Sequence, residues 1–140
     1  MSEPIAIQEA LIYAMVTVSA ADSNMTDAEL KTIGDLVKGL PIFHNYDPEA
    51  LLLTASSCGE QLQGENGLSD VLTIIAESLP SYLYDTAYAL AVEVAAADVQ
   101  LEREELRFLQ MLRNRLGLDR LTVAAIERSA IARFRTAKQS

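Results

Sequence analysis

A stretch of eleven residues that occurs twice, 76 positions apart, constrains the fold of this chain more than any other feature. Residues 20–30 read AADSNMTDAEL, and residues 96–106 read AADVQLEREEL. Each copy has one carboxylate at the end of an alanine-rich apolar segment and another seven residues later, where a new helix is predicted to begin. These four carboxylates are Asp22, Glu29, Asp98 and Glu105. Similarity at a fixed offset is typical of one supersecondary unit used twice, and the unit predicted here is a helix, a short acidic turn and a second helix.

Dense helix-start and helix-stop signals run along the rest of the chain, with little sign of strands. Predicted helices cover about 4–21, 26–39, 81–97 and 102–116. Three more are expected to begin at Asp47, near Asn66 or Ser69, and at Asp119. The core face of the first helix is predicted to be a stripe of Ile7, Leu11, Ala14, Met15, Val18 and Ala21. The sequence therefore predicts an all-α, compact bundle of about seven helices with two pseudo-symmetric helix-turn-helix halves.

Length and composition place the chain among small single domains. We expect residues 1–140 to form one domain, with a basic tail at about 132–140 that frays. The single cysteine, Cys58, excludes a disulfide within the chain and suits a reducing compartment. The first residues, MSEP, lack the basic region of a secretory leader, and no apolar stretch approaches the ~20 residues that span a bilayer. The expected location is the cytoplasm, without membrane insertion.

The net charge of −9 is unevenly distributed along the chain. Residues 1–102 carry 16 acidic and two basic side chains, whereas residues 103–140 carry nine basic and four acidic ones, so their net charges are −14 and +5. Nucleic-acid binding needs clustered Lys and Arg to neutralise phosphates, so we expect no nucleic-acid partner. We interpret the arginines of the second part as residues of outer helix faces that offset the acidic part. A docking site for an acidic partner is the less favoured interpretation.

The repeated acidic turns have a structural and a functional interpretation. Glu29 and Glu105 fall in first helical turns, where the helix dipole favours acids in any case. Asp22 and Asp98 fall at helix C-termini, where a negative charge is disfavoured unless a cation binds there. Carboxylate and carbonyl oxygens suit Ca²⁺ or Mg²⁺, so the four carboxylates are a candidate site for one of these cations. The turns are not EF-hands, because their Asp-to-Glu spacing is seven rather than about eleven.

Other kinds of chemistry have little support in the sequence. His44 and Cys58 are the only residues of their types, so zinc and iron–sulfur sites lack ligands. Cys58 falls within a predicted helix, where a buried thiol is more common than a catalytic one, and His44 falls in a connection. Neither a glycine-rich phosphate loop nor a nucleophile elbow occurs. We therefore expect neither enzyme activity nor catalytic residues.

The repeated turns and their flanking helices resemble the TerB-like tellurite-resistance family. The resemblance covers residues 5–130 and is strongest in the segment 85–98, DTAYALAVEVAAAD, and in the segment 19–30, SAADSNMTDAEL. It implies an all-α fold of two pseudo-symmetric halves whose acidic residues take part in divalent-cation binding. The matching positions here are Asp22, Glu29, Asp98 and Glu105. The chain departs from the family pattern at Ser23 and Val99, where the family commonly has glycine.

The leading hypothesis is a non-enzymatic, cation-binding accessory protein of the tellurite-resistance and stress-response type, with other proteins of such a system as partners. A second hypothesis is a helical scaffold for protein–protein interactions that has no metal site. A third is a small hydrolase that uses carboxylates and two metal ions. Binding of divalent cations separates the first hypothesis from the second, and activity on phosphoester or amide substrates would support the third.

Overall fold

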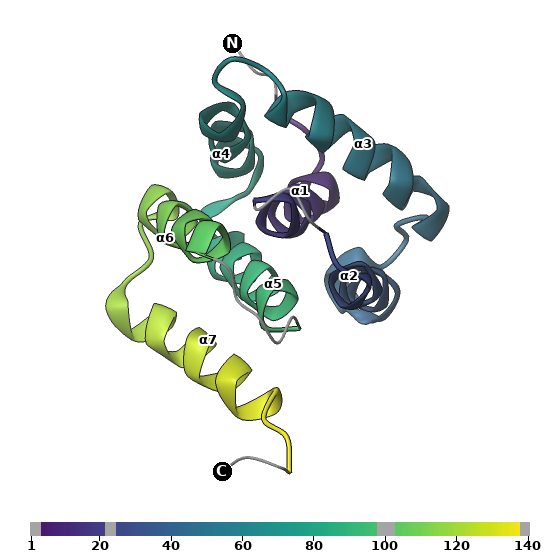
Figure 1. The fold of residues 1–140 in the computed structure, drawn as a ribbon. Coiled ribbons are helices and arrows are strands. Elements are labelled where there is room, and N and C mark those ends of the chain that lie inside the picture. Colours follow the sequence, from purple (N-terminus) through teal and green to yellow (C-terminus); the bar gives the residue numbers. More distant parts are fainter. Residues whose placement is uncertain (1–3, 22–24, 98–102, 138–140) are drawn as a thin grey trace.

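The computed structural model describes residues 4–21, 25–97 and 103–137 (Figure 1). Across these three ranges the chain forms seven α-helices and three short 3₁₀ helices, and it contains no strand. The α-helices are α1 (Ile7–Ala20), α2 (Asp27–Gly39), α3 (Leu51–Leu62), α4 (Gly67–Ser78), α5 (Tyr84–Ala96), α6 (Arg103–Leu116) and α7 (Arg120–Arg133). The 3₁₀ helices are η1 (Pro41–Phe43), η2 (Pro48–Ala50) and η3 (Ser81–Leu83). The predicted all-α bundle of seven helices is thus confirmed.

Helix α1 lies at the centre of the bundle, and α2 to α6 surround it (Figure 1). Its ten consecutive residues from Ala10 to Ser19 are all buried. The predicted core face is confirmed at Leu11, Ala14, Met15 and Val18, and the burial of their neighbours shows that the helix is covered on its other sides as well. Ile7, a member of the predicted stripe, is instead 37% exposed. A helix that is apolar around its whole circumference is typical of such a central position.

The sequence repeat is also a structural repeat. A shift of 76 positions carries the bounds of α1 onto those of α5 and the bounds of α2 onto those of α6, each to within one residue. The two first helices, α1 and α5, make the most extensive contact in the molecule. Each second helix also contacts the first helix of the other copy, since α2 packs on α5 and α6 packs on α1. The two copies therefore share one interface.

Several helix starts differ from the sequence-based predictions. Helix α1 begins at Ile7 rather than near Pro4, and Glu9 accepts a hydrogen bond from the backbone N–H of Ala6 at 3.1 Å. Helices α3 and α5 are each preceded by a 3₁₀ turn, so they begin about three residues later than expected. Helix α4 begins at Gly67, and Asn66 makes no side-chain cap there. Before α3 and α5 the chain thus forms a tighter turn than the capping pattern alone implies.

Other termini follow local chemistry as predicted. Thr26 and Glu29 form the expected capping box at the start of α2. Asp119 caps α7 by accepting a hydrogen bond of 2.8 Å from the backbone N–H of Thr122. Gly117 ends α6 with a φ of +66°, a left-handed conformation that glycine adopts without strain. In the described parts of the chain, no helix is long and apolar enough to cross a membrane.

Candidate functional site

Glu29 lies in the first turn of α2 and is fully buried. Its Oε1 accepts a hydrogen bond of 2.9 Å from the backbone N–H of Thr26, and its own backbone N–H donates to Thr26 Oγ1 at 3.1 Å. Its other carboxylate oxygen, Oε2, is also buried and accepts no hydrogen bond from any described residue. Burial of a carboxylate oxygen without a donor or a cation is costly. The capping box therefore satisfies only Oε1 of this carboxylate and leaves Oε2 without a hydrogen-bond donor.

Glu105 occupies the equivalent position one repeat later, in the first turn of α6, and it too is fully buried. Glutamate is among the residues least often buried completely. A first-turn acid that only complements the helix dipole can do so from the surface, as the exposed Asp27 and Glu104 do in the same two helices. Two buried glutamates at matched positions thus exceed what helix capping requires.

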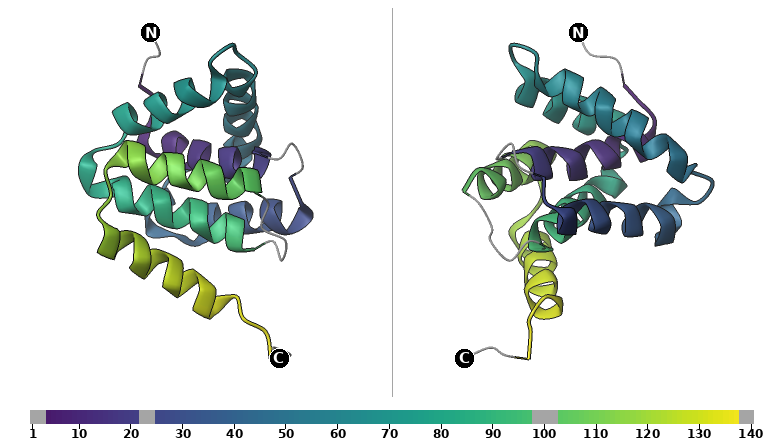
Figure 2. Two further views of the ribbon diagram at one scale, coloured as in Figure 1. Left: turned by 60° about the vertical axis from the view of Figure 1, so that its left-hand side comes forward. Right: turned by 45° about the vertical axis from the view of Figure 1, so that its right-hand side comes forward.

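The ends of the helices that carry these glutamates lie on the same side of the molecule. The C-terminal ends of α1 and α5 and the N-terminal ends of α2 and α6 all point to the right in the left panel of Figure 2. The two other predicted ligands, Asp22 and Asp98, lie outside the described residues. The structure therefore places Glu29 and Glu105 at one end of the bundle and leaves the four-carboxylate site a prediction. In the described ranges, no three Asp, Glu, His or Cys side chains gather into a metal-binding group.

The chemistry of the donors suits a hard cation better than any other ligand. Glu29 and Glu105 supply carboxylate oxygens at the N-termini of α2 and α6, and the C-termini of α1 and α5 supply backbone carbonyl oxygens on the same side. Ca²⁺ and Mg²⁺ take ligands of both types. A free anion such as an oxyanion would be repelled by buried carboxylates and by the −14 charge of residues 1–102. Buried carboxylates at this end of the bundle are therefore chemically suited to a hard cation.

Cys58 and His44 do not form a catalytic pair. Cys58 is fully buried in α3, where its thiol lies 3.3 Å from Thr17 Oγ1. Burial raises the pKa of this thiol to about 11, so it stays protonated at neutral pH. His44 is exposed after η1, and its backbone carbonyl accepts a hydrogen bond from Gln8 at 3.1 Å. The predicted structural role of Cys58 is confirmed by its burial.

A polar cluster on the other side of α5 was not predicted. The fully buried Tyr88 donates a hydrogen bond of 2.5 Å from its hydroxyl to Glu127 Oε2, on α7. Arg113 Nη1, on α6, donates to the same hydroxyl at 3.2 Å and forms an ion pair with Glu127 at 3.3 Å. The desolvation of the phenol and its bond to Glu127 raise the pKa of Tyr88 to about 12. No local sequence signal pairs these residues, because they come from three helices.

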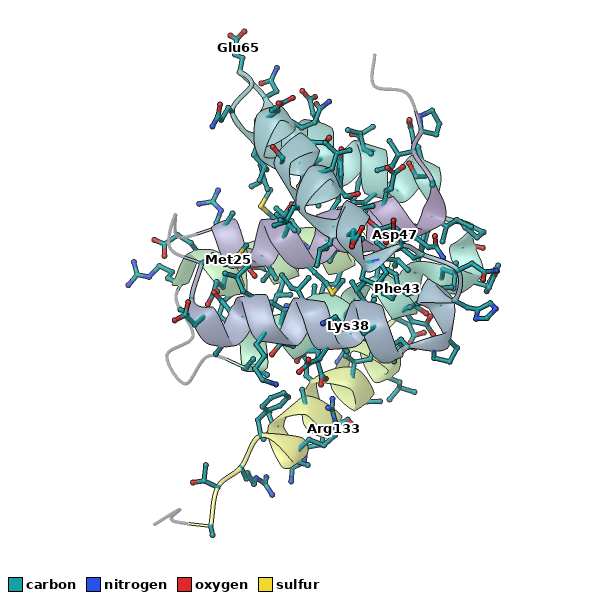
Figure 3. All side chains as sticks on the ribbon, turned by 90° about the vertical axis from the view of Figure 1, so that its right-hand side faces the viewer. Met25, Lys38, Phe43, Asp47, Glu65 and Arg133 are labelled. Carbon is teal, nitrogen blue, oxygen red and sulfur yellow. The ribbon has the colours of Figure 1, made fainter. Side chains whose placement is uncertain are left out.

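A groove of about 420 Å³ lies between α2 and α7, with α5 beneath it. Figure 3 looks onto this side, with Lys38 on α2 above and Arg133 on α7 below. The groove is lined by Leu36, Leu40, Ala89, Leu90, Glu93, Ala125, Ile126, Ser129 and Arg133. At its edge, Arg133 binds both carboxylate oxygens of Glu93, at 2.6 and 2.8 Å. Its walls are mainly apolar, and it is separate from the end of the bundle that holds Glu29 and Glu105.

Comparison with known proteins identifies no relative of this chain: no family model, no curated protein and no solved structure matches it.

Proposed function

We propose that this protein is a non-enzymatic, divalent-cation-binding accessory module of the TerB-like type. Asp22, Glu29, Asp98 and Glu105 are the proposed ligands or near neighbours of Ca²⁺ or Mg²⁺. The observation that carries this proposal is the buried Oε2 of Glu29, which no described residue supplies with a donor. The complete burial of Glu105 at the equivalent position supports it. A cation between these turns would offset buried negative charge from both copies of the repeat.

The proposed role follows from the position of the site. Each acidic turn joins a central helix, α1 or α5, to a helix that packs across the other copy. A cation held there would stabilise the contact between the two copies and the surface around it. We propose that protein partners of a cytoplasmic tellurite-resistance or stress-response system bind this surface. Direct capture of tellurite is not part of the proposal, because the chain carries a net charge of −9.

Calorimetric titration of chelator-treated protein with Ca²⁺, Mg²⁺ and Mn²⁺ tests cation binding. We expect stoichiometric binding of at least one cation, lost in the double variant Asp22→Ala/Asp98→Ala. The matched control is Asp27→Ala/Glu104→Ala, which removes the same charge from exposed first-turn positions of the same helices and should leave binding intact. At 100 times its dissociation constant, the cation should also raise the free energy of unfolding by about 2.7 kcal/mol.

Three results would contradict the proposal. These are heat changes no larger than those of buffer for all three cations, equal binding by both double variants, and an unfolding temperature that does not respond to a bound cation. Absence of binding heat would mean that the repeated acidic turns have only a structural role.

One observation favours the scaffold as a second candidate. Leu30 and Leu106, which follow the two buried glutamates, are 51% and 50% exposed. Large apolar side chains at matched exposed positions are typical of a binding surface. A scaffold without a metal site predicts partner capture that persists in chelator and is lost in Leu30→Asp/Leu106→Asp. A cation-dependent module predicts capture that chelator abolishes.

A further inference from the structure

Helix α4 has no counterpart in the second half of the molecule as the structure describes it. In the first half, α3 packs on α1, and α4 lies against both of them and against α6. In the second half, α5 corresponds to α1, α2 takes the place of α6, and α7 packs on α5 as α3 packs on α1. Figure 1 shows α4 at the upper left and no described helix at the matching place beside α2 and α7, at the lower right. One of two equivalent positions for a helix is therefore filled from within the chain, and the other is open.

Matched contacts show that α3 and α7 occupy equivalent positions. Thr17 of α1 contacts Cys58 of α3, with 3.3 Å between Oγ1 and Sγ. Glu93 of α5 comes 76 positions after Thr17, and it binds Arg133 of α7, which comes 75 positions after Cys58. The same part of each central helix thus contacts the third helix of its own half.

The groove beside α7 lies where a counterpart of α4 would lie. Helix α4 rests on α1, α3 and α6, and the groove is walled by the three corresponding helices, α5, α7 and α2. Leu112 and Leu116 of α6 are 0% and 6% exposed. Leu36 and Leu40, 76 positions earlier on α2, are only half-buried and line the groove. The groove volume of about 420 Å³ is within the range of ligand-binding pockets.

The charges beside the groove favour an acidic occupant. Helix α7 carries three arginines and one glutamate, a net charge of +2. Lys38 and Arg133 lie above and below the groove in Figure 3. Helix α4, in the filled position, carries Asp70 and Glu77 and no basic residue, so its net charge is −2. A second helix of the same kind would bring negative charge to the basic α7.

We propose that the groove binds one acidic, amphipathic α-helix of a partner protein, in the place that corresponds to α4. Its apolar face would cover Leu36, Leu40 and Ile126, and its acidic side chains would lie near Lys38 and Arg133. Binding of an apolar helix face in a groove between helices is a recurring mode of peptide recognition. The inference uses none of the residues of the proposed cation site, so its failure would leave that proposal unaffected.

Fluorescence anisotropy with a labelled peptide of the α4 sequence tests the groove. The probe is residues 66–80, NGLSDVLTIIAESLP, held helical by a hydrocarbon staple between positions 69 and 73, because isolated helices of this length are marginal in water. We expect the native full-length chain to bind it saturably, with a dissociation constant below about 1 mM. A stapled peptide of the same composition in scrambled order should not bind.

Two neighbouring alanines of α7 provide a matched pair of variants. Ala124 and Ala125 are both exposed, but Ala125 lines the groove and Ala124 does not. We expect Ala125→Glu to weaken binding of the probe at least about tenfold, because it places a negative charge on an apolar wall that meets an acidic helix. Ala124→Glu adds the same charge outside the groove and should leave binding nearly unchanged. Circular dichroism on both variants separates lost binding from lost folding.

The proposal would be overturned by a probe that does not bind the native protein up to about 1 mM, the weak end of specific binding. Equal weakening by the two glutamate variants, or equal binding of the scrambled peptide, would also overturn it. A native protein that forms a dimer, lost in Ala125→Glu and kept in Ala124→Glu, would assign the groove to a second copy of the chain instead.

Discussion

At the residue scale, Tyr88 makes the polar contact with the clearest energetic consequence. Its hydroxyl is buried and bonded to the Glu127 carboxylate, and Arg113 contacts both groups. Hydrogen bonds to a charged group contribute more than neutral ones, about 1.5–3 kcal/mol each. The cluster joins α5, α6 and α7, so it stabilises the position of α7, which has little apolar cover of its own.

Replacement of this hydroxyl should destabilise the protein without changing the fold. We expect Tyr88→Phe to lower the free energy of unfolding by about 1.5 kcal/mol, near the low end for a charged partner, because Glu127 and Arg113 still pair with each other. Urea denaturation measures the change. Tyr82→Phe removes a hydroxyl from a side chain that is 74% exposed, and it should change stability by less than about 0.5 kcal/mol. Equal effects of the two variants would show that the cluster does not stabilise the fold.

The same cluster predicts a dependence on alkaline pH. The pKa of Tyr88 is raised from 10.0 to about 12, so the folded protein holds this proton more tightly than the unfolded chain. Its contribution to stability is full below pH 10 and declines as the pH rises towards 12. The stability difference between native protein and Tyr88→Phe should therefore be constant below pH 10 and shrink above it. A difference that grows between pH 10 and 12 would contradict this assignment.

At the scale of elements, the connection from α3 to α4 depends on one glycine. A Cβ added at Gly67 would lie against the backbone of Leu62, closer than side-chain carbons normally approach. We expect Gly67→Ala to shift the turn and lower the free energy of unfolding by about 1–3 kcal/mol. At Gly59, within α3, a Cβ meets nothing within 4 Å, so Gly59→Ala should stabilise the helix by up to about 1 kcal/mol. Thermal denaturation of both variants tests this contrast, which fails if the two changes have the same sign.

At the scale of the whole molecule, α5 packs against helices of both copies of the repeat and against α7. It contacts α1, α2, α6 and α7, and the small side chain of Ala91 is fully buried within it. Ala89, on the same helix, is half-buried and lines the groove between α2 and α7. The two alanines thus occupy positions with very different amounts of free space.

Enlarging the two alanines should affect the stability of the bundle to very different degrees. We expect Ala91→Leu to lower the free energy of unfolding by about 1–3 kcal/mol, because close-packed interiors do not accommodate added methylenes. Ala89→Leu should be tolerated within about 0.5 kcal/mol, because its side chain can extend into the groove. Urea denaturation of the pair measures the difference. Similar losses in both would show that the groove has no room for a larger side chain.

The sequence by itself determined the features that depend on neighbouring residues. The 76-residue repeat predicted α1–α2 and α5–α6 as equivalent units, and their bounds agree with this. The capping box of Thr26 and Glu29, the cap by Asp119 and the left-handed Gly117 follow from chemistry within a few residues of the chain. The sequence also predicted carboxylates at both turns, of which Glu29 and Glu105 lie in the described residues.

The tertiary structure alone decided which sides of the helices are covered. An apolar period can predict one buried face, but it could not show that α1 is buried all round, or that Glu29 and Glu105 are buried completely. The bond of Tyr88 to Glu127 and the groove beside α7 join residues more than 35 positions apart. Such contacts depend on how helices pack, because a side chain is buried only when several elements surround it. Helix ends, in contrast, depend on hydrogen bonds between residues that are close in the sequence.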